Sequence, residues 1–221
     1  MTKLKSGHQL LVVLIILIVP SIFYLLIRTG KNQYTTLEIF GPREAPAQVG
    51  GDTIYHTIGD FELVSHTGTP VVPAQFDGKI LVTNFFFATC TTICPKMNMQ
   101  MKRLQEKFKS DSLVALLSIT VNPEHDSVPV LAAYAESYGA KYPQWTFATG
   151  DKKVIYDLAR NGYFLTAMPG NGGPDDFIHS EKIVLIDKEK RIRGYYDGTD
   201  YLDVDRLAED IQMLEFEYNN K

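Results

Sequence analysis

The chain has 221 residues but only two cysteines, Cys90 and Cys94. A small disulfide-rich domain needs several bridges, and a single pair cannot supply them. The fold must therefore depend on an ordinary hydrophobic core, for which a chain of this length with 45% hydrophobic residues is sufficient. A structural zinc site is also disfavoured, because such sites usually have four ligands and no further cysteine exists to complete one.

Positive charge is not in excess either. The formal net charge is −4, and lysine and arginine do not gather in one stripe of the sequence. This argues against a nucleic-acid partner, which would need a basic surface. The sequence also has no internal repeat and no low-complexity segment. A single globular domain of about 170 residues with an appendage is therefore expected.

The appendage is an apolar run at residues 10–27, which contains no charged side chain. Its length is near the minimum for an α-helix that crosses a bilayer. Pro20 is tolerated more readily in a membrane helix than in a soluble one. A cleaved signal peptide is the alternative, but its apolar region usually spans only ~7–15 residues and ends at a small-residue cleavage site, which is not found here. The sequence therefore predicts a single, uncleaved N-terminal transmembrane helix.

The basic residues that flank this run give only a slight positive-inside bias, because two lie on each side. A single N-terminal anchor nevertheless favours an inner (cytoplasmic) membrane protein whose globular part faces the periplasm or another extracytoplasmic space. Residues 1–30 are therefore assigned to the membrane anchor. Residues 31–50 contain two prolines and few periodic apolar residues, which is typical of a linker. Residues 51–221 should form the globular domain.

The two cysteines lie where a predicted strand gives way to a predicted helix. Residues 80–87 form a nearly continuous hydrophobic run, as expected of a central strand buried on both faces. A helical pattern follows at residues 95–109. Free backbone N–H groups and the helix dipole would stabilise a thiolate at this turn. At the helical spacing of i and i+4, both sulfurs would face one ligand; the alternative is a pair of small, buried apolar side chains.

The rest of the domain is predicted to alternate strands and helices. Residues 113–121 and 145–148 are predicted strands, residues 128–138 and 151–160 helices, residues 183–187 and 192–196 a hairpin, and residues 203–216 a final helix. Asp126 or Ser127 is expected to cap the helix at residues 128–138. The order β-α-β-α followed by β-β-α predicts an α/β protein with a thioredoxin-like fold. Such sheets usually keep their sites at the carboxyl ends of central strands, where the cysteine turn lies.

His179 differs from the other four histidines in its position. It follows a loop rich in glycine, proline and aspartate at residues 169–176 and precedes the predicted strand at residues 183–187. In a thioredoxin-like fold, the loop that enters this strand passes beside the active cysteines. A lone histidine is more often structural than a ligand, but beside two thiols it becomes a candidate ligand. Two thiolates and one imidazole suit Cu(I), and imidazole also accepts Cu(II).

Three segments together resemble the Sco/SenC family of membrane-anchored, thioredoxin-like copper chaperones. They are FFFATCTTICPKM around the cysteines, ITVNPEHDSVPVL at residues 119–131, and IHSEKIVLIDKEKRIRGYYDGT from residue 178 onward. The resemblance extends from about residue 52 to the C-terminus. It implies that Cys90, Cys94 and His179 bind copper, as Cu(I) and as Cu(II).

The resemblance also implies partners. One is the copper-centre subunit of cytochrome c oxidase, to which the protein would deliver copper or whose thiols it would keep reduced. The other is a copper donor protein. The family often has Asp-Pro where this chain has Asn122-Pro123. That position is not an expected ligand, so the assigned copper site is unaffected.

Two enzymatic alternatives use the same thiols. A dedicated thiol-disulfide reductase would cycle Cys90 and Cys94 between dithiol and disulfide. A peroxiredoxin-like peroxidase is suggested by residues 91–95, which resemble the T-x-x-C-P core of that family and would make Cys94 the peroxidatic thiol. Peroxiredoxins place a proline seven residues before that cysteine, where this chain has Phe87. The sequence therefore favours a metallochaperone over an enzyme, with the reductase as the closer alternative.

Overall fold

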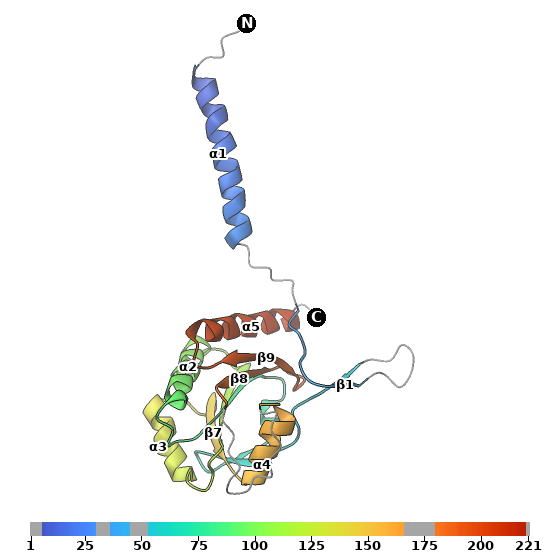
Figure 1. The fold of residues 1–221 in the computed structure, drawn as a ribbon, viewed down its shortest axis with the longest axis vertical. Coiled ribbons are helices and arrows are strands. Elements are labelled where there is room, and N and C mark those ends of the chain that lie inside the picture. Colours follow the sequence, from blue (N-terminus) through green and yellow to red (C-terminus); the bar gives the residue numbers. More distant parts are fainter. Residues whose placement is uncertain (1–5, 30–35, 45–52, 166–179, 220–221) are drawn as a thin grey trace. The chain divides into compact units, whose positions relative to one another are not determined.

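The structure, a computed structural model, describes residues 6–29, 36–44, 53–165 and 180–219 (Figure 1). The chain forms two compact units, Met1–Thr35 and Thr36–Lys221. The folded unit therefore includes residues 36–44, which the sequence analysis assigned to the linker of residues 31–50. In this segment, the Phe40 N–H donates to the Ile192 carbonyl at 2.9 Å, so the folded unit begins earlier than the predicted boundary at residue 51.

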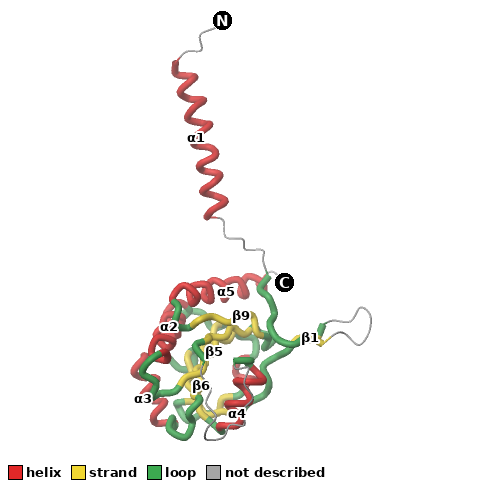
Figure 2. Tube along the Cα trace, in the orientation of Figure 1, coloured by secondary structure: helices red, strands yellow, loops and turns green. Residues whose placement is uncertain are grey.

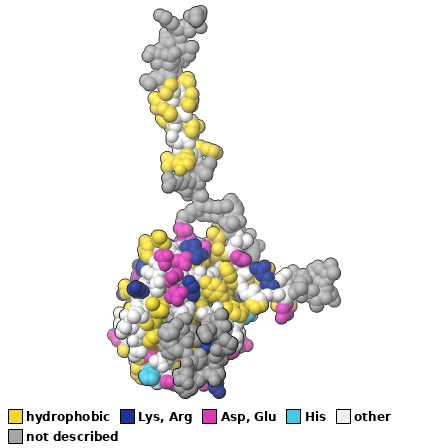
Figure 3. Space-filling view, in the orientation of Figure 1, with side chains coloured by type: hydrophobic (Ala, Val, Ile, Leu, Met, Phe, Trp, Pro, Cys, Tyr) yellow, Lys and Arg dark blue, Asp and Glu magenta, His cyan; other side chains and the backbone are white. Residues whose placement is uncertain are grey.

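The first unit contains one helix, α1 (Ser6–Thr29), which includes Pro20. Its described side chains are exposed and mostly apolar, as the space-filling view shows (Figure 3). The helix predicted over residues 10–27 is therefore present. Judged by length and hydropathy, none of the helices in the described part of the chain could span a membrane. The transmembrane assignment stays a prediction.

The second unit is built on a seven-stranded sheet with the strand order β4-β3-β7-β6-β5-β8-β9. β5, β6 and β7 run parallel to one another, whereas β8 pairs antiparallel with β5 and β9 pairs antiparallel with β8. The strand bounds are β3 Leu63–Ser65, β4 Pro70–Val71, β5 Ile80–Phe86, β6 Val114–Thr120, β7 Trp145–Thr149, β8 Lys182–Ile186 and β9 Ile192–Asp197. A separate pair, β1 (Arg43–Glu44) and β2 (Ile54–Tyr55), lies outside this sheet.

Helices cover both faces of the sheet, which gives three layers (Figure 2). α2 (Ile93–Lys107), α3 (Val128–Tyr138) and α5 (Tyr201–Asn219) contribute to the hydrophobic cluster on one face. α4 (Lys152–Asp157) and the helical turn η2 (Leu158–Gly162) contribute to the cluster on the other face. A short 3-10 turn, η1 (Pro73–Phe76), precedes β5. The predicted order of strands and helices is confirmed, with bounds that shift by a few residues.

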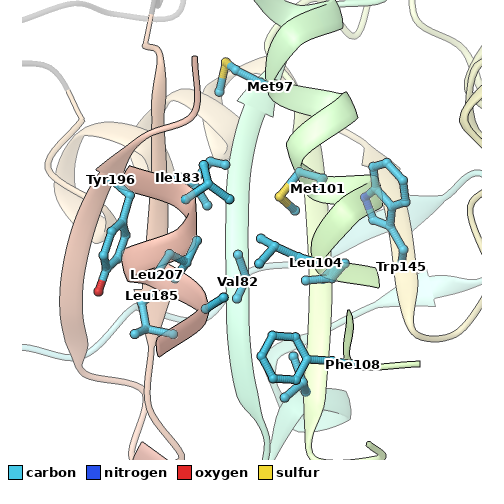
Figure 4. Packing of buried hydrophobic residues seen from close by; sticks show 14 of the residues in the cluster. Val82, Met97, Met101, Leu104, Phe108, Trp145, Ile183, Leu185, Tyr196 and Leu207 are labelled. Carbon is cyan, nitrogen blue, oxygen red and sulfur yellow. The ribbon is translucent and has the colours of Figure 1, made fainter. Parts of the chain in front are cut away.

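β5 is a central strand in which apolar and polar residues do not alternate, although it contains Thr83 and Asn84. All seven of its residues are buried. Successive side chains point to opposite faces, so Val82 joins the cluster under α2 and α5, while Leu81 joins the cluster under α4. Figure 4 shows Val82 between Leu104 of α2 and Leu207 of α5. Because both faces are covered, no polar alternation is needed in this strand.

A buried charge cluster connects the first and last described segments of the folded unit, residues 36–44 and α5, to the β8–β9 hairpin. The Arg193 guanidinium, only 4% exposed, lies 3.1 Å from Asp187 Oδ2 and 3.1 Å from Glu217 Oε2 on α5. It also donates to the Leu37 carbonyl at 2.7 Å. Each charge is therefore paired and hydrogen-bonded, which is the condition under which ionised groups are tolerated in a protein interior.

We expect Arg193→Met to destabilise the folded unit by about 3 kcal/mol, because the carboxylates of Asp187 and Glu217 lose the Arg193 cation that pairs with them away from water. Urea unfolding of the full-length chain, followed by tryptophan fluorescence, measures this change. Arg43→Met is the matched control: Arg43 pairs with Glu38 at 3.8 Å, but both side chains are at least half exposed. Its loss should cost about 1 kcal/mol or less. Equal effects of the two substitutions would contradict this account.

Candidate functional site

The cysteine turn joins the carboxyl end of β5 to the start of α2. The Cys90 N–H donates to the Phe87 carbonyl at 3.2 Å, and Thr92 is the N-cap of the helix. α2 begins at Ile93, so Cys94 lies in its first turn while Cys90 lies before it. The predicted strand-to-helix turn is present, and because Cys90 is not helical, the turn and not helical spacing sets the relation between the two sulfurs.

The two sulfurs are nevertheless brought together by the helix start. The Cys94 N–H donates to Cys90 Sγ at 3.4 Å. The Thr92 hydroxyl lies 3.7 Å from the same sulfur. Backbone N–H groups of a helix first turn have no partner within the helix and carry partial positive charge, so they favour a negative sulfur. The turn therefore has the thiolate-stabilising character that the sequence predicted, with a different geometry.

The two thiols differ in acidity. Both are free and buried, Cys90 being 9% exposed and Cys94 2%. Burial would raise the pKa of Cys90, but hydrogen bonds from the Cys94 thiol and from the backbone of Cys94 and Thr92 outweigh it and lower the pKa to about 7. For Cys94, burial and then the neighbouring Cys90 raise the pKa to about 12. Cys90 is therefore the thiolate of the pair near neutral pH, and Cys94 remains a thiol until a metal or a base removes its proton.

A buried polar network fixes the helix that carries Cys94. Asn98, one turn further along α2, accepts from Asn84 Nδ2 of β5 at 3.2 Å and donates to the Tyr134 hydroxyl of α3 at 3.0 Å. Ser118 of β6 donates to Asn84 Oδ1 at 2.6 Å. Asn84, Asn98 and Ser118 are fully buried, and polar groups in such positions need partners. The network therefore links α2 to the sheet and to α3 directly behind the dithiol.

The third predicted ligand, His179, lies outside the described residues. The described chain resumes at Ser180, whose hydroxyl accepts from the Lys182 N–H at 3.1 Å. Ile183 of β8 pairs with Asn84 of β5 in an antiparallel register, so β8 begins at the edge where β5 ends. Ser180 is therefore at the same edge of the sheet as the cysteine turn. Within the described ranges, no three His, Cys, Asp or Glu side chains gather as a metal site.

Sequence reasoning missed Asp126 as a residue of this region. Ser127 occupies the N-cap position of α3 but makes no side-chain capping hydrogen bond, and Asp126 is not the cap. Asp126 is fully buried and accepts from the Ala88 N–H of the cysteine turn at 2.9 Å. A signal was available, because Asp126 belongs to one of the three segments that carry the family resemblance. Nothing in the linear pattern, however, shows that its carboxylate turns inward.

Comparison with known proteins decides the family. The SCO1/SenC family pattern matches residues 51–215 and thus most of the chain. The chain belongs to the SCO1/SenC family. The SCO1 protein homolog of Bacillus subtilis (strain 168) is 26% identical over 163 residues, a match that covers 73% of this chain and 84% of that protein. The mitochondrial SCO2 homolog of Mus musculus is 30% identical over 143 residues. That match covers 62% of this chain and 55% of the mouse protein, so the chain spans about half its length.

Solved Sco structures share the fold. BsSco, a member of the Sco family of cytochrome c oxidase assembly proteins in which a disulfide switch was identified, matches with a TM-score of 0.61 and 25% identity. The match covers 72% of this chain and 93% of that one. Arabidopsis thaliana ScoI, solved with copper bound, matches with a TM-score of 0.56 and 25% identity over 70% of this chain and 97% of that one. The predicted thioredoxin-like α/β fold is confirmed.

The unequal acidity of the two thiols generates a prediction. In the reduced full-length protein, the rate of Cys90 alkylation by iodoacetamide should rise with pH to a plateau with a midpoint of about 7, because only the thiolate reacts. Cys94 should stay unmodified over the same range. Peptide mass spectrometry after timed quenching measures both rates. In Cys94→Ala, which removes the donating thiol, the Cys90 midpoint should move upward. Faster modification of Cys94 than of Cys90 would be the contrary result.

Proposed function

We propose that this protein is a copper-binding chaperone for cytochrome c oxidase, and that Cys90, Cys94 and His179 are its copper ligands. It delivers copper to the binuclear copper centre of the oxidase or maintains the thiols of that centre. The observation that carries the proposal is the buried pair of sulfurs, held together at a helix start in a chain of the SCO1/SenC family. Copper is the cargo in this function, so the site must bind it and release it.

The donor set fits copper. Thiolate sulfur is a soft ligand that selects Cu(I), and imidazole nitrogen adds affinity for Cu(II). Cys90 enters as a thiolate, while the Cys94 proton leaves when the metal binds, because a bound metal deprotonates its thiol ligands. Support for copper comes from Arabidopsis thaliana ScoI, which was solved with copper bound. Support for the oxidase comes from BsSco, which belongs to a family of cytochrome c oxidase assembly proteins.

The partners follow from this role. A copper donor protein loads the site, and the copper-centre subunit of cytochrome c oxidase receives the copper or the electrons. The apolar run at residues 10–27 anchors the protein in the inner membrane, with the folded unit on the periplasmic or extracytoplasmic side. Support for the anchor is the absence of charge in this run and the mostly apolar, exposed surface of α1.

A dedicated thiol-disulfide reductase is the second candidate. It is favoured by the lowered pKa of Cys90, since a thiolate near neutral pH can attack a partner disulfide. In this reaction, Cys90 Sγ bonds to one partner sulfur and the other leaves as a thiolate. Cys94 Sγ loses its proton and attacks Cys90 Sγ, which displaces the partner sulfur bonded to it, so that two electrons pass to the partner and a Cys90–Cys94 disulfide forms. The disulfide switch identified in BsSco supports this chemistry.

Copper binding by the full-length protein separates the two candidates. The reduced protein should bind one Cu(I), whereas the protein with a Cys90–Cys94 disulfide should bind it at least about a hundredfold more weakly, because a disulfide sulfur is a poor ligand. His179→Ala should weaken binding of both oxidation states, and more strongly that of Cu(II), which prefers nitrogen donors. Competition with chelators of known affinity, under anaerobic conditions for Cu(I), measures these changes.

His125→Ala is the matched control, because His125 is exposed and lies outside the proposed ligand set. It should leave copper affinity unchanged. If His179→Ala altered the reactivity of the thiols but not copper affinity, the reductase would be favoured. Equal Cu(I) affinity of the reduced and oxidised proteins would overturn the thiolate site.

The location is tested separately. With an uncleaved anchor, alkaline phosphatase fused after Lys221 should be active in intact cells, because it requires an oxidising, extracytoplasmic compartment. The mature protein should keep its N-terminal segment, which mass spectrometry of the intact chain can detect. Activity of a cytoplasmic reporter at the same position, with an inactive phosphatase fusion, would contradict the proposed orientation.

A further inference from the structure

Asp126 stands beside the cysteine turn because of the parallel pairing of β5 and β6. These strands pair from Ile80 opposite Val114 to Phe86 opposite Thr120, so their carboxyl ends lie side by side. The chain after β6 then turns sharply, with the Asp126 N–H donating to the Asn122 carbonyl at 2.9 Å. This turn directs the carboxylate back toward the cysteine turn, where it is fully buried.

One carboxylate oxygen of Asp126 accepts two hydrogen bonds. Oδ2 accepts from the Ala88 N–H at 2.9 Å and from the Thr120 hydroxyl. The Thr120 hydroxyl oxygen also accepts from the Asn122 N–H at 3.0 Å. A single carboxylate therefore connects the two loops that follow β5 and β6. Hydrogen bonds to an ionised acceptor are stronger than those between neutral groups.

The other oxygen has no such partner. Among the described buried side-chain nitrogen and oxygen atoms, Oδ1 of Asp126 alone lacks a hydrogen bond. Burying a carboxylate oxygen without a hydrogen-bond partner costs free energy. A position that served only to pack the core would therefore not contain a carboxylate. An asparagine could also accept from the Ala88 N–H, but as a neutral group it would hold that N–H more weakly than a carboxylate does. Stability of the fold therefore does not by itself explain why residue 126 is an aspartate.

Ala88 lies next to Phe87, whose backbone contacts both cysteines. Phe87, its neighbour, accepts from the Cys90 N–H through its carbonyl, and its backbone also hydrogen-bonds the Cys94 thiol. Fixing the Ala88 N–H therefore fixes the peptide that positions both cysteines. Holding two reacting groups in one geometry raises their effective concentration.

We propose that Asp126 is a positioning residue for the dithiol: its carboxylate anchors the Ala88 N–H and thereby keeps Cys90 and Cys94 close enough to form a disulfide or to share one metal. Asp126 acts through the turn and is not itself a ligand. The inference rests on the proposed function only in taking Cys90 and Cys94 as the reactive pair. It applies equally to the copper chaperone and to the reductase.

The equilibrium of the full-length protein with glutathione tests this role without copper. Oxidised glutathione takes two electrons and two protons from Cys90 and Cys94, one S–S bond forms in the protein, and two reduced glutathione molecules are released. Asp126→Ala should lower this equilibrium constant about tenfold, the size expected for the loss of one charge-assisted hydrogen bond. Asp126→Asn keeps a carbonyl acceptor for the Ala88 N–H and should lower it only about threefold. The disulfide fraction is measured by quenching, alkylation and mass spectrometry.

Asp151→Ala is the matched control. Asp151 Oδ1 likewise accepts two hydrogen bonds, from the Lys153 and Val154 N–H groups, but it caps α4 on the exposed surface. Its loss should reduce stability and leave the glutathione equilibrium unchanged. A folded Asp126→Ala protein with an unchanged constant would overturn the proposal, as would an equal shift in Asp151→Ala. If Asp126→Ala does not fold, Asp126→Asn decides: a lowered constant supports the role, and an unchanged one refutes it.

Discussion

The parallel pairing of β5 with β6 is the constraint on which the rest of the site depends. Seven consecutive residue pairs join the two strands, and every residue of both is buried. This pairing brings the cysteine turn and the loop containing Asp126 to one edge of the sheet. β8, paired on the other side of β5, begins at the same edge. Three segments that are far apart in sequence therefore meet there, because the carboxyl ends of the parallel strands β5 and β6 coincide and the antiparallel β8 begins beside them.

The dithiol owes its chemistry to the place where α2 begins. Had the helix started before Cys90, the Cys94 N–H would be paired within the helix and could not donate to the Cys90 sulfur. Because the helix starts at Ile93, this N–H is free to stabilise a thiolate. The same burial that leaves Cys94 protonated makes the pair unequal. In the proposed function, one sulfur of such a pair would be available to a metal as a thiolate, and the other would release its proton only on binding.

The charge cluster that stabilises the fold and the candidate functional site lie at opposite ends of the sheet strands. The cluster of Asp187, Arg193 and Glu217 lies where β8 ends and β9 begins, at the opposite end of these strands from the cysteine turn. It connects the hairpin, α5 and residues 36–44 through buried, paired charges. The site edge, by contrast, contains free thiols and a carboxylate with one unpartnered oxygen. The unpartnered carboxylate oxygen at the site lowers the stability of the fold. The fold tolerates it because the charge cluster stabilises the other end of these strands.

The sequence alone determined the order of strands and helices, the α/β class and the family, and it predicts the two cysteines as the chemical centre. The order and the class follow from local periodicity, and the family follows from the resemblance of three sequence segments to the SCO1/SenC family; none of these needs knowledge of distant contacts. Residues 128–138, for example, form α3 with the predicted bounds. The domain start at Thr36 and the inward direction of Asp126 were decided only by tertiary structure. In both cases the partner lies far along the chain: Phe40 bonds Ile192, and Asp126 bonds Ala88. Local propensity does not encode such partners, because the free energy of each contact exists only after the sheet has brought the two segments together.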